Sequence, residues 1–255
     1  MNTPMAKAAG TAALAAVVLT CASTAQAAVV TLSGWAFGSG GAVASTTGGA
    51  SSVPSYSGLA GGLAGALTGA GVLDTPSLVT YSIELEEPVA FSGMPVAGYA
   101  LQDAASYFAA RRIGDALRPE GTLVAERLGR LFTWVQADAT RVDTAAESTA
   151  LQLAVWNIVY DGDWSLFNPA GNYSDTSSHA VLANIMMANA SLTANRLEVF
   201  ALAASGQPDL LVTALRVPEP GTFALAGLAL AGAVQAGRRR SRSATSASSA
   251  NRPRL

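Results

Sequence analysis

The chain has 255 residues, of which 50% are hydrophobic and 13% are charged, and its formal net charge is −2. The charges are uneven: residues 28–216 hold eight arginines and 16 acidic side chains, whereas six further arginines follow Gly237. Nucleic-acid binding needs a basic face that neutralises phosphates, so this acidic central region excludes it.

The first 27 residues have the pattern of a secretory signal peptide. Lys7 precedes an apolar stretch over residues 8–19, and Ala25 and Ala27 supply the small residues that signal cleavage requires. We therefore expect passage through the secretion translocon and cleavage before Ala28. The only cysteine, Cys21, lies within this segment. The mature chain should therefore have no disulfide, thiolate nucleophile or cysteine-based zinc site.

Residues 28–76 form a region rich in Gly, Ser and Ala, which favours loops or short glycine-tolerant strands. A clearer pattern begins in residues 77–216, which we interpret as the core of the exported domain. Apolar residues alternate with polar ones from Val79 to Leu85, and this period of two predicts a half-buried strand.

Helical signals follow this strand. Asp103 can cap a helix over residues 103–117 that Pro119 ends, and a second helix begins near Thr122. Thr144 and Glu147 have the spacing of a capping box and predict the start of a third helix.

A fourth helix is predicted over residues 177–189, with Leu182, Ile185 and Met186 buried. Strand-like runs at residues 197–202 and 210–215 follow it. We therefore predict an α+β fold: an antiparallel β-sandwich-like region, built from the segments before Glu87 and after Arg196, with three to four helices inserted between them.

The loop after the third helix is rich in oxygen ligands. A calcium site there is the weaker interpretation, with Asp161 and Asp163 as first candidates, although the spacing does not match an EF-hand. The stronger interpretation is a turn-rich loop with Trp164 and Phe167 tucked in. His179 is the only histidine, and a solvated surface role is favoured over general-base catalysis.

The C-terminal region combines three features of a membrane-sorting signal. Two prolines keep the backbone extended and accessible to a protease, an apolar run over residues 222–236 can enter a bilayer, and arginines behind the run should stay cytoplasmic. The run covers roughly 22 Å of the ~30 Å hydrocarbon core, which suits a transient anchor. The proline-containing motif consists of Val217, Pro218, Glu219, Pro220 and Gly221. The arginines behind the apolar run are Arg238, Arg239 and Arg240.

These features, over residues 217–240, resemble the sorting tail of PEP-CTERM proteins of Gram-negative bacteria. The resemblance implies recognition and processing by exosortase, a membrane-embedded cysteine transpeptidase, and release or attachment at a surface rich in exopolysaccharide. Residues 241–255 form an additional basic, serine-rich tail that should be cytoplasmic, where such signals usually end within a few residues.

The interior, over roughly residues 56–221, is similar to PEP-CTERM proteins related to thioester domains. Residues 80–85 resemble their Thr-Tyr-Cys-Ile-Glu-Leu strand, and residues 150–161 resemble their Gln-x-Ala-Ile-Trp helix. The resemblance places Ser82 at the cysteine position and Gln152 at the glutamine that would form the thioester. A serine hydroxyl without an adjacent base is a weak nucleophile, so we read Gln152 as a buried amide that holds the helix against the strand.

Three functional classes follow from these observations. The favoured class is an exported, non-catalytic protein of the cell surface or extracellular matrix, without cofactor or catalytic residue. The alternatives are an exported carbohydrate-active hydrolase, which would need a pair of carboxylates in a pocket, and an adhesin that binds without thioester chemistry.

Overall fold

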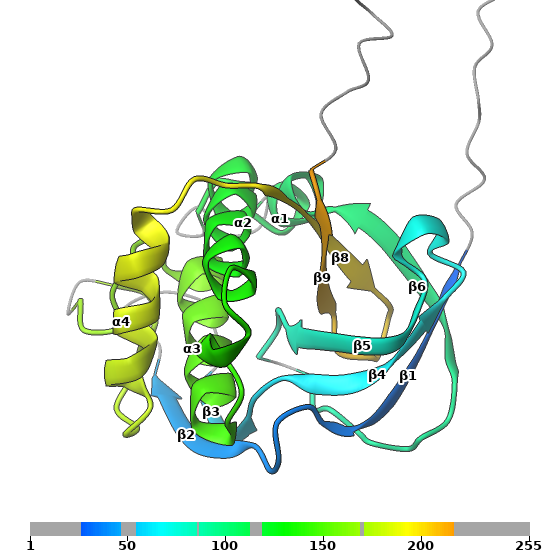
Figure 1. Ribbon diagram of the computed structural model, residues 1–255, viewed down its shortest axis with the longest axis horizontal. Helices are drawn as coiled ribbons and strands as arrows, with labels where there is room; N and C mark the ends of the chain where they lie inside the picture. The colour runs from blue at the N-terminus through cyan, green and yellow to red at the C-terminus, as the bar shows by residue number, and fades with distance from the viewer. Residues whose placement is uncertain (1–26, 47–54, 86, 113–118, 169–170, 217–255) are drawn as a thin grey trace, which may run out of the picture.

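The computed structural model describes residues 27–46, 55–85, 87–112, 119–168 and 171–216. Six antiparallel strands close into a barrel in the order β1-β4-β5-β9-β8-β6 (Figure 1). Their bounds are Ala28–Trp35 for β1, Leu63–Thr68 for β4, Thr75–Ser82 for β5, Val96–Asp103 for β6, Leu197–Ala203 for β8 and Leu210–Leu215 for β9.

A smaller sheet of three strands lies beside the barrel. Its order is β3 (Tyr56–Ala60), β2 (Gly41–Thr46) and β7 (Ser174–Asp175). Small residues let a helix approach this sheet closely: a Cβ on Gly41 would lie 2.6 Å from Thr149 Oγ1, and the Gly41 N–H donates a hydrogen bond to that oxygen.

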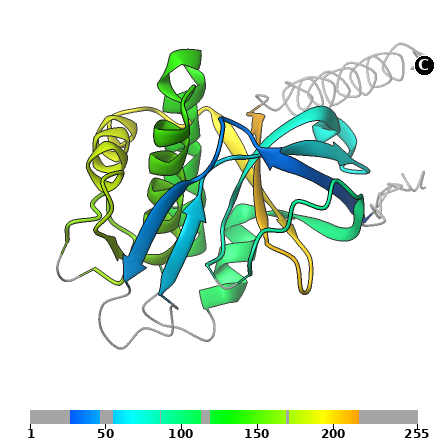
Figure 2. The same ribbon diagram turned by 90° about the horizontal axis from the view of Figure 1, so that it is seen from below.

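The described residues form four α-helices: α1 (Ala104–Arg112), α2 (Gly121–Gln136), α3 (Ala145–Tyr160) and α4 (Ala180–Ser191). Figures 1 and 2 show α2, α3 and α4 grouped on one side of the barrel, with α3 between α4 and the strands. Two short 3-10 helices, η1 (Gly71–Leu73) and η2 (Ala139–Arg141), complete the described elements.

Two hydrophobic cores hold these layers together. Side chains such as Val30, Leu67 and Tyr99 fill the barrel, whereas the larger core lies between the barrel and the helices. Helix α3 is buried on all sides from Ser148 to Tyr160, because the small sheet, α4 and the barrel surround it. Residues on α3 can therefore reach the barrel wall directly.

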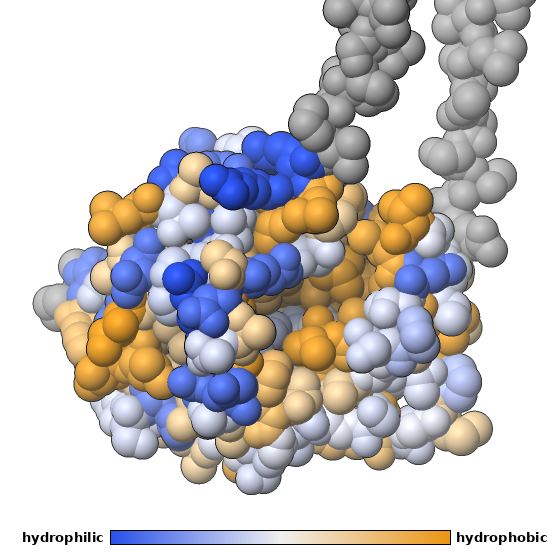
Figure 3. Space-filling view, viewed as in Figure 1, coloured by the Kyte–Doolittle hydropathy of each residue, from blue (hydrophilic) through white to orange (hydrophobic). Residues whose placement is uncertain are grey.

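An apolar groove separates α2 from β5. It has a volume of about 390 Å³, and Tyr81, Phe132, Val142 and Leu211 are among its walls. Figure 3 shows it as a hollow with hydrophobic sides.

The predicted mixture of helices and antiparallel strands is confirmed, but the form of the sheet differs from the prediction. The strands close into a barrel instead of forming two stacked layers. One barrel strand, β6, lies inside the segment that we predicted to hold only helices. Its outer residues are mostly exposed and Tyr99 is its one fully buried side chain, so it lacks the alternating pattern that identifies a strand.

The helix starts agree with the capping signals. The Asp103 carboxylate accepts a hydrogen bond from the Ser106 N–H at 2.9 Å, and Thr144 and Glu147 form the predicted capping box. Helix α1 is described to Arg112, and the rest of its predicted span lies outside the described residues. The prediction that Ile185 is buried is wrong: its side chain is 52% exposed, because α4 packs through Ala183, Met186 and Met187 instead.

The segment around Ser82 was predicted to be half-buried, but its polar side chains are buried as well. Thr80, Ser82 and Glu84 are buried along with Tyr81 and Ile83, because the barrel covers one face and α3 the other. The polar members of this set make internal hydrogen bonds; for example, the Thr80 hydroxyl donates to the Leu211 carbonyl at 2.7 Å.

Within the described ranges, no helix has both the length and the apolar character needed to cross a membrane. The membrane helix predicted over residues 222–236 lies outside those ranges, as does almost all of the predicted signal peptide.

Candidate functional site

The structure brings Ser82 and Gln152 into direct contact. The Gln152 side-chain oxygen accepts a hydrogen bond from the Ser82 N–H at 3.1 Å, and its side-chain nitrogen donates to the Ser82 carbonyl at 2.8 Å. Ser82 ends β5, where the ladder to β9 finishes, and Gln152 comes from the middle of α3. Ser82 still pairs with Leu210 of β9, but the ladder to β4 stops at Thr80, and the buried Gln152 amide bonds to both backbone groups of Ser82.

The Ser82 hydroxyl is engaged by backbone groups of Glu84. It donates to the Glu84 carbonyl at 2.8 Å and accepts from the Glu84 N–H at 3.2 Å. Both interactions close a local turn at the end of the strand. Neither brings a general base to the hydroxyl, so this arrangement does not activate Ser82 as a nucleophile.

A pocket of about 400 Å³ opens over this pair, and we call it the Ser82 pocket. Two aromatic pairs line it: Trp35 with Phe91, whose ring centroids are 5.0 Å apart, and Tyr56 with Trp156, at 5.1 Å. Ser82, Gln152, Glu84 and Glu87 are its polar lining residues.

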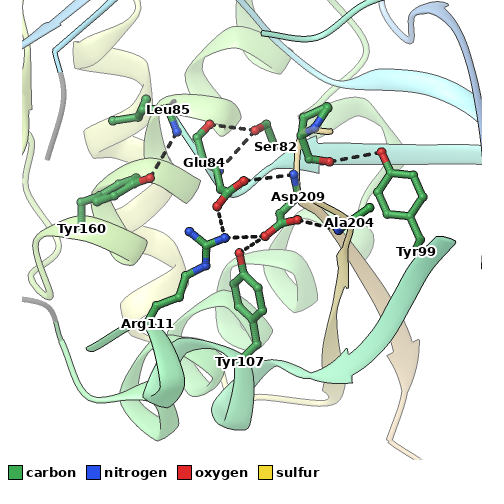
Figure 4. A network of polar contacts seen from close by, with 10 residues as sticks. Ser82, Glu84, Leu85, Tyr99, Tyr107, Arg111, Tyr160, Ala204 and Asp209 are labelled. Carbon is green, nitrogen blue, oxygen red and sulfur yellow. Dashed lines mark hydrogen bonds and ion pairs between the residues drawn. The ribbon is translucent and has the colours of Figure 1, made fainter. Parts of the chain in front are cut away.

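A network of charged and hydroxyl groups lies next to the Ser82 pocket (Figure 4). Arg111, on α1, forms ion pairs with Glu84 and with Asp209; its distance to the Asp209 carboxylate is 2.6 Å. The Tyr107 hydroxyl donates to the same carboxylate. The network therefore ties α1 to the ends of two barrel-wall segments.

Asp209 is the centre of this network. Its second carboxylate oxygen accepts the Ala204 N–H at 3.0 Å, and its own N–H donates to Glu84 at 3.4 Å. The Asp209 carbonyl also accepts the Ile83 N–H at 3.0 Å. These bonds close the turn between β8 and β9 and dock it against the strand that carries Ser82.

Burial, together with the nearby charge of Asp209, raises the pKa of Glu84 from 4.5 to about 7. Burial likewise raises the pKa of Tyr107, so its hydroxyl stays protonated and remains a donor. Two neighbouring carboxyl groups, one with a raised pKa, can form an acid–base pair. Here, however, each of their oxygens is already engaged by Arg111, Tyr107 or a backbone N–H.

The acidic loop after α3 makes its own internal hydrogen bonds. Asp163 accepts the Ser165 N–H at 2.8 Å and the Asn168 amide at 2.6 Å, and Asp161 accepts the Asn172 N–H at 3.0 Å. Among the described residues, no group of three or more His, Cys, Asp or Glu side chains is placed to hold a metal ion. The carboxylates act as turn-forming acceptors in this structure.

Two aromatic residues of this loop behave differently. Trp164 packs against the main core, and the Arg127 guanidinium lies 5.4 Å from its ring centroid. The prediction that Phe167 is tucked in is wrong, because its side chain is 58% exposed and Leu166 fills the interior instead.

The one remaining predicted site residue within the described ranges, His179, is not part of this centre. His179 precedes α4 and lies beside Gly41 of the small sheet, partly buried. Residues 217–221 and 238–240, the predicted sorting motif and membrane stop, lie outside the described residues.

The network of Glu84, Arg111, Tyr107 and Asp209 was not predicted from the sequence. The alternating pattern assigned Glu84 to a solvent-facing row, and Arg111 lay in a helix without a clear apolar stripe. Nothing in the sequence around Glu84 marks it as buried, although a buried carboxylate needs a cationic or hydrogen-bonding partner. Which arginine supplies it depends on the tertiary fold.

The comparisons with known proteins agree with the predicted tail. Residues 216–241 match the PEP-CTERM protein-sorting motif. This motif implies export, anchoring in the membrane before processing, and recognition by exosortase, a membrane enzyme. No curated protein matches the sequence.

One solved structure is weakly similar to the domain. It is a cysteine-to-alanine mutant of the N-terminal thioester domain of a surface protein from Clostridium perfringens, with 20% sequence identity and a TM-score of 0.40. The match covers 59% of this chain and 88% of that one.

Proposed function

We propose that this protein is a non-catalytic component of the cell surface or extracellular matrix of a Gram-negative bacterium. In this proposal the secretion translocon exports it, residues 222–236 anchor it transiently, and exosortase processes it near Pro218 and Pro220. The observation that carries the proposal is the sorting motif at residues 216–241, which begins directly after β9 ends at Leu215.

The geometry around Ser82 supports a role without catalysis. The serine stands at the position where the thioester-domain resemblance expects cysteine, and its hydroxyl bonds to the backbone of Glu84. Glu84 and Asp209 are held by Arg111 and by backbone donors. These groups therefore stabilise the domain, and its acidic surface remains for contacts with exopolysaccharide, cations or neighbouring proteins.

Mass spectrometry of the C-terminus tests this proposal. The protein is recovered from the surface and medium of an exosortase-positive host and of the same host without exosortase. We expect processing near residues 217–221 only in the first host. The triple variant Pro218→Ala, Glu219→Ala, Pro220→Ala should stay unprocessed, whereas the control Glu198→Ala, which changes an exposed side chain on β8, should be processed normally. Recovery of intact Arg238, Arg239 and Arg240 in the medium contradicts the proposal.

One observation favours a hydrolase as the second candidate. Glu84, with its pKa raised to about 7, lies beside Asp209 in a surface pocket of about 400 Å³. A carboxyl with a raised pKa beside a second carboxyl is the arrangement that glycoside hydrolysis uses. Polysaccharide hydrolysis by the wild type that disappears in Glu84→Gln would establish this candidate and overturn the non-catalytic proposal.

A further inference from the structure

The Ser82 pocket carries negative charge that is only partly balanced. Glu84 and Glu87 line it, and no Arg, Lys or His is among its described lining residues. Glu84 is paired with Arg111, but the Oε2 atom of Glu87 is buried and accepts no hydrogen bond from any described residue. Because an unpaired buried carboxylate oxygen is costly, this position favours a cationic ligand.

The aromatic walls of the pocket also favour a cationic ligand. Trp35 and Phe91 meet edge to face at 72°, and Tyr56 and Trp156 are tilted by 58°. Aromatic faces attract cations, and they also stack against the apolar carbon faces of cyclic ligands. A flat ligand that carries both features would use these walls fully.

Trp156 adds a hydrogen-bond donor. Its side chain is 3% exposed, and its indole N–H is buried without an acceptor among the described residues. A buried indole N–H normally has a partner. Since Trp156 lines the Ser82 pocket, a ligand hydroxyl can supply this acceptor.

Together, the free carboxylate oxygen, the aromatic walls and the unpaired donor define a complementary ligand. It carries an ammonium group, an apolar ring face and hydroxyl groups. The volume of about 400 Å³ lies within the range of roughly 300–1,000 Å³ that small-ligand sites occupy. We propose that the Ser82 pocket binds an amino sugar with a free, protonated amine, through Glu87 and Trp156.

Binding at this site is non-covalent, because the Ser82 hydroxyl is occupied by the Glu84 backbone and no bond has to form or break. The inference rests on the proposed function, to which it adds a ligand class for the exported domain. An amine is exposed only on de-acetylated sugars, so the site should distinguish these from their N-acetylated forms.

Isothermal titration calorimetry on the full chain, purified in a non-ionic detergent, tests this inference. Glucosamine, glucose and N-acetylglucosamine share one ring and differ in charge at a single substituent. Glucosamine should bind at least about tenfold more tightly than the other two, and added salt should weaken it selectively.

Matched variants assign the effect to the pocket. Glu87→Gln keeps the shape of the side chain but removes its charge, so its affinity for glucosamine should fall about tenfold, to the level of glucose. Trp156→Phe keeps an aromatic ring but removes the N–H donor, so it should lower the affinity for glucosamine and the affinity for glucose by similar factors. Glu198→Gln and Trp134→Phe, which change residues that do not line the pocket, should bind as the wild type does. Thermal unfolding of each variant checks that it is folded.

Several results would overturn the inference. Equal affinity for glucose and glucosamine would make this a neutral-sugar site, and no saturable binding of glucosamine would remove the site altogether. Unchanged glucosamine affinity in a folded Glu87→Gln variant would place binding elsewhere. The titration uses unprocessed protein, so its outcome is independent of the C-terminal mass spectrometry that tests export and sorting.

Discussion

Gln152 connects a helix to a strand through one buried side chain. Its amide satisfies both the N–H and the carbonyl of Ser82. In Gln152→Leu both backbone groups stay buried without partners, so we expect the free energy of unfolding to fall by about 2–4 kcal/mol. Gln136→Leu is the control, because its amide bonds to Thr213 at the exposed surface and should change stability by less than about 0.5 kcal/mol. Urea unfolding followed by tryptophan fluorescence measures both; similar small changes would contradict the structural role of Gln152.

A single substitution at Ser82 tests whether its position retains the geometry of a thioester. In Ser82→Cys the thiol lies beside the Gln152 amide, and a sulfur attacking that amide carbon forms an acyl thioester and expels one ammonia. We expect the intact mass to fall by one ammonia. The double variant Ser82→Cys, Gln152→Glu has no amide nitrogen to release and should show no such loss. A Ser82→Cys protein that keeps its full mass at neutral and mildly alkaline pH would show that the contact is structural only.

Glu84 should make the stability of the domain depend on pH above the usual carboxylate range. Its folded-state pKa of about 7 exceeds its ordinary value of 4.5, so the folded state holds this proton more tightly than the unfolded state does. The resulting stabilisation is complete below pH 4.5 and is lost as the pH rises through 7, by an amount on the order of 2 kcal/mol.

Glu84→Gln cannot lose this proton, so its unfolding free energy should lack the decline that the wild type shows between about pH 4.5 and 7. Glu126→Gln is the matched control, since hydrogen bonds from Asn195 and Arg130 outweigh its burial and lower the pKa of Glu126. It should keep the wild-type slope. Urea midpoints at several pH values measure the effect, and an equal slope in Glu84→Gln would assign the titration to another group.

Helices α1 and α2 cross closely at Gly121. A Cβ built there would press on the Ala105 carbonyl oxygen and lie 2.6 Å from the Ala109 backbone nitrogen, and neither backbone atom can rotate away. Gly121→Ala should therefore lower the unfolding free energy by about 2–3 kcal/mol. Gly34→Ala has nothing within 4 Å of the new Cβ and should cost less than about 1 kcal/mol. Thermal unfolding of the pair provides the test, and a tolerated Gly121→Ala would mean that the two helices are further apart.

The elements differ in how far the sequence could predict them. The start of α3 was readable because Thr144 and Glu147 satisfy each other locally. The bounds of β2, β3 and β4 were not readable, because these strands are rich in Gly, Ala and Ser residues, whose burial depends on the neighbouring strand instead of on their own hydrophobicity.

The candidate site shows the same division. The contact between Ser82 and Gln152 could be expected from two short motifs, whereas the Ser82 pocket could not. Trp35, Tyr56 and Phe91 come from separate segments that only the closure of the barrel and the docking of α3 bring together. A closed sheet depends on long-range register, which a local pattern of polar and apolar residues does not encode.

The arrangement of charge in the whole chain makes processing visible without sequencing. Residues 28–216 contain twice as many acidic side chains as arginines, and all six arginines after Gly237 are removed if the tail is cut near residues 217–221. Processing therefore raises the net negative charge of the protein by about six elementary charges at neutral pH.

Isoelectric focusing should accordingly separate the two forms. Protein from exosortase-positive cells should focus at a more acidic pH than protein from cells without exosortase. The variant Arg238→Gln, Arg239→Gln, Arg240→Gln supplies the charge standard, because an uncut chain that lacks three arginines should focus between the two forms. Identical focusing in both hosts would mean that the six arginines remain attached. The acidic domain would then stay joined to a basic tail that can bind anionic lipid headgroups, and the protein would act at the membrane instead of beyond it.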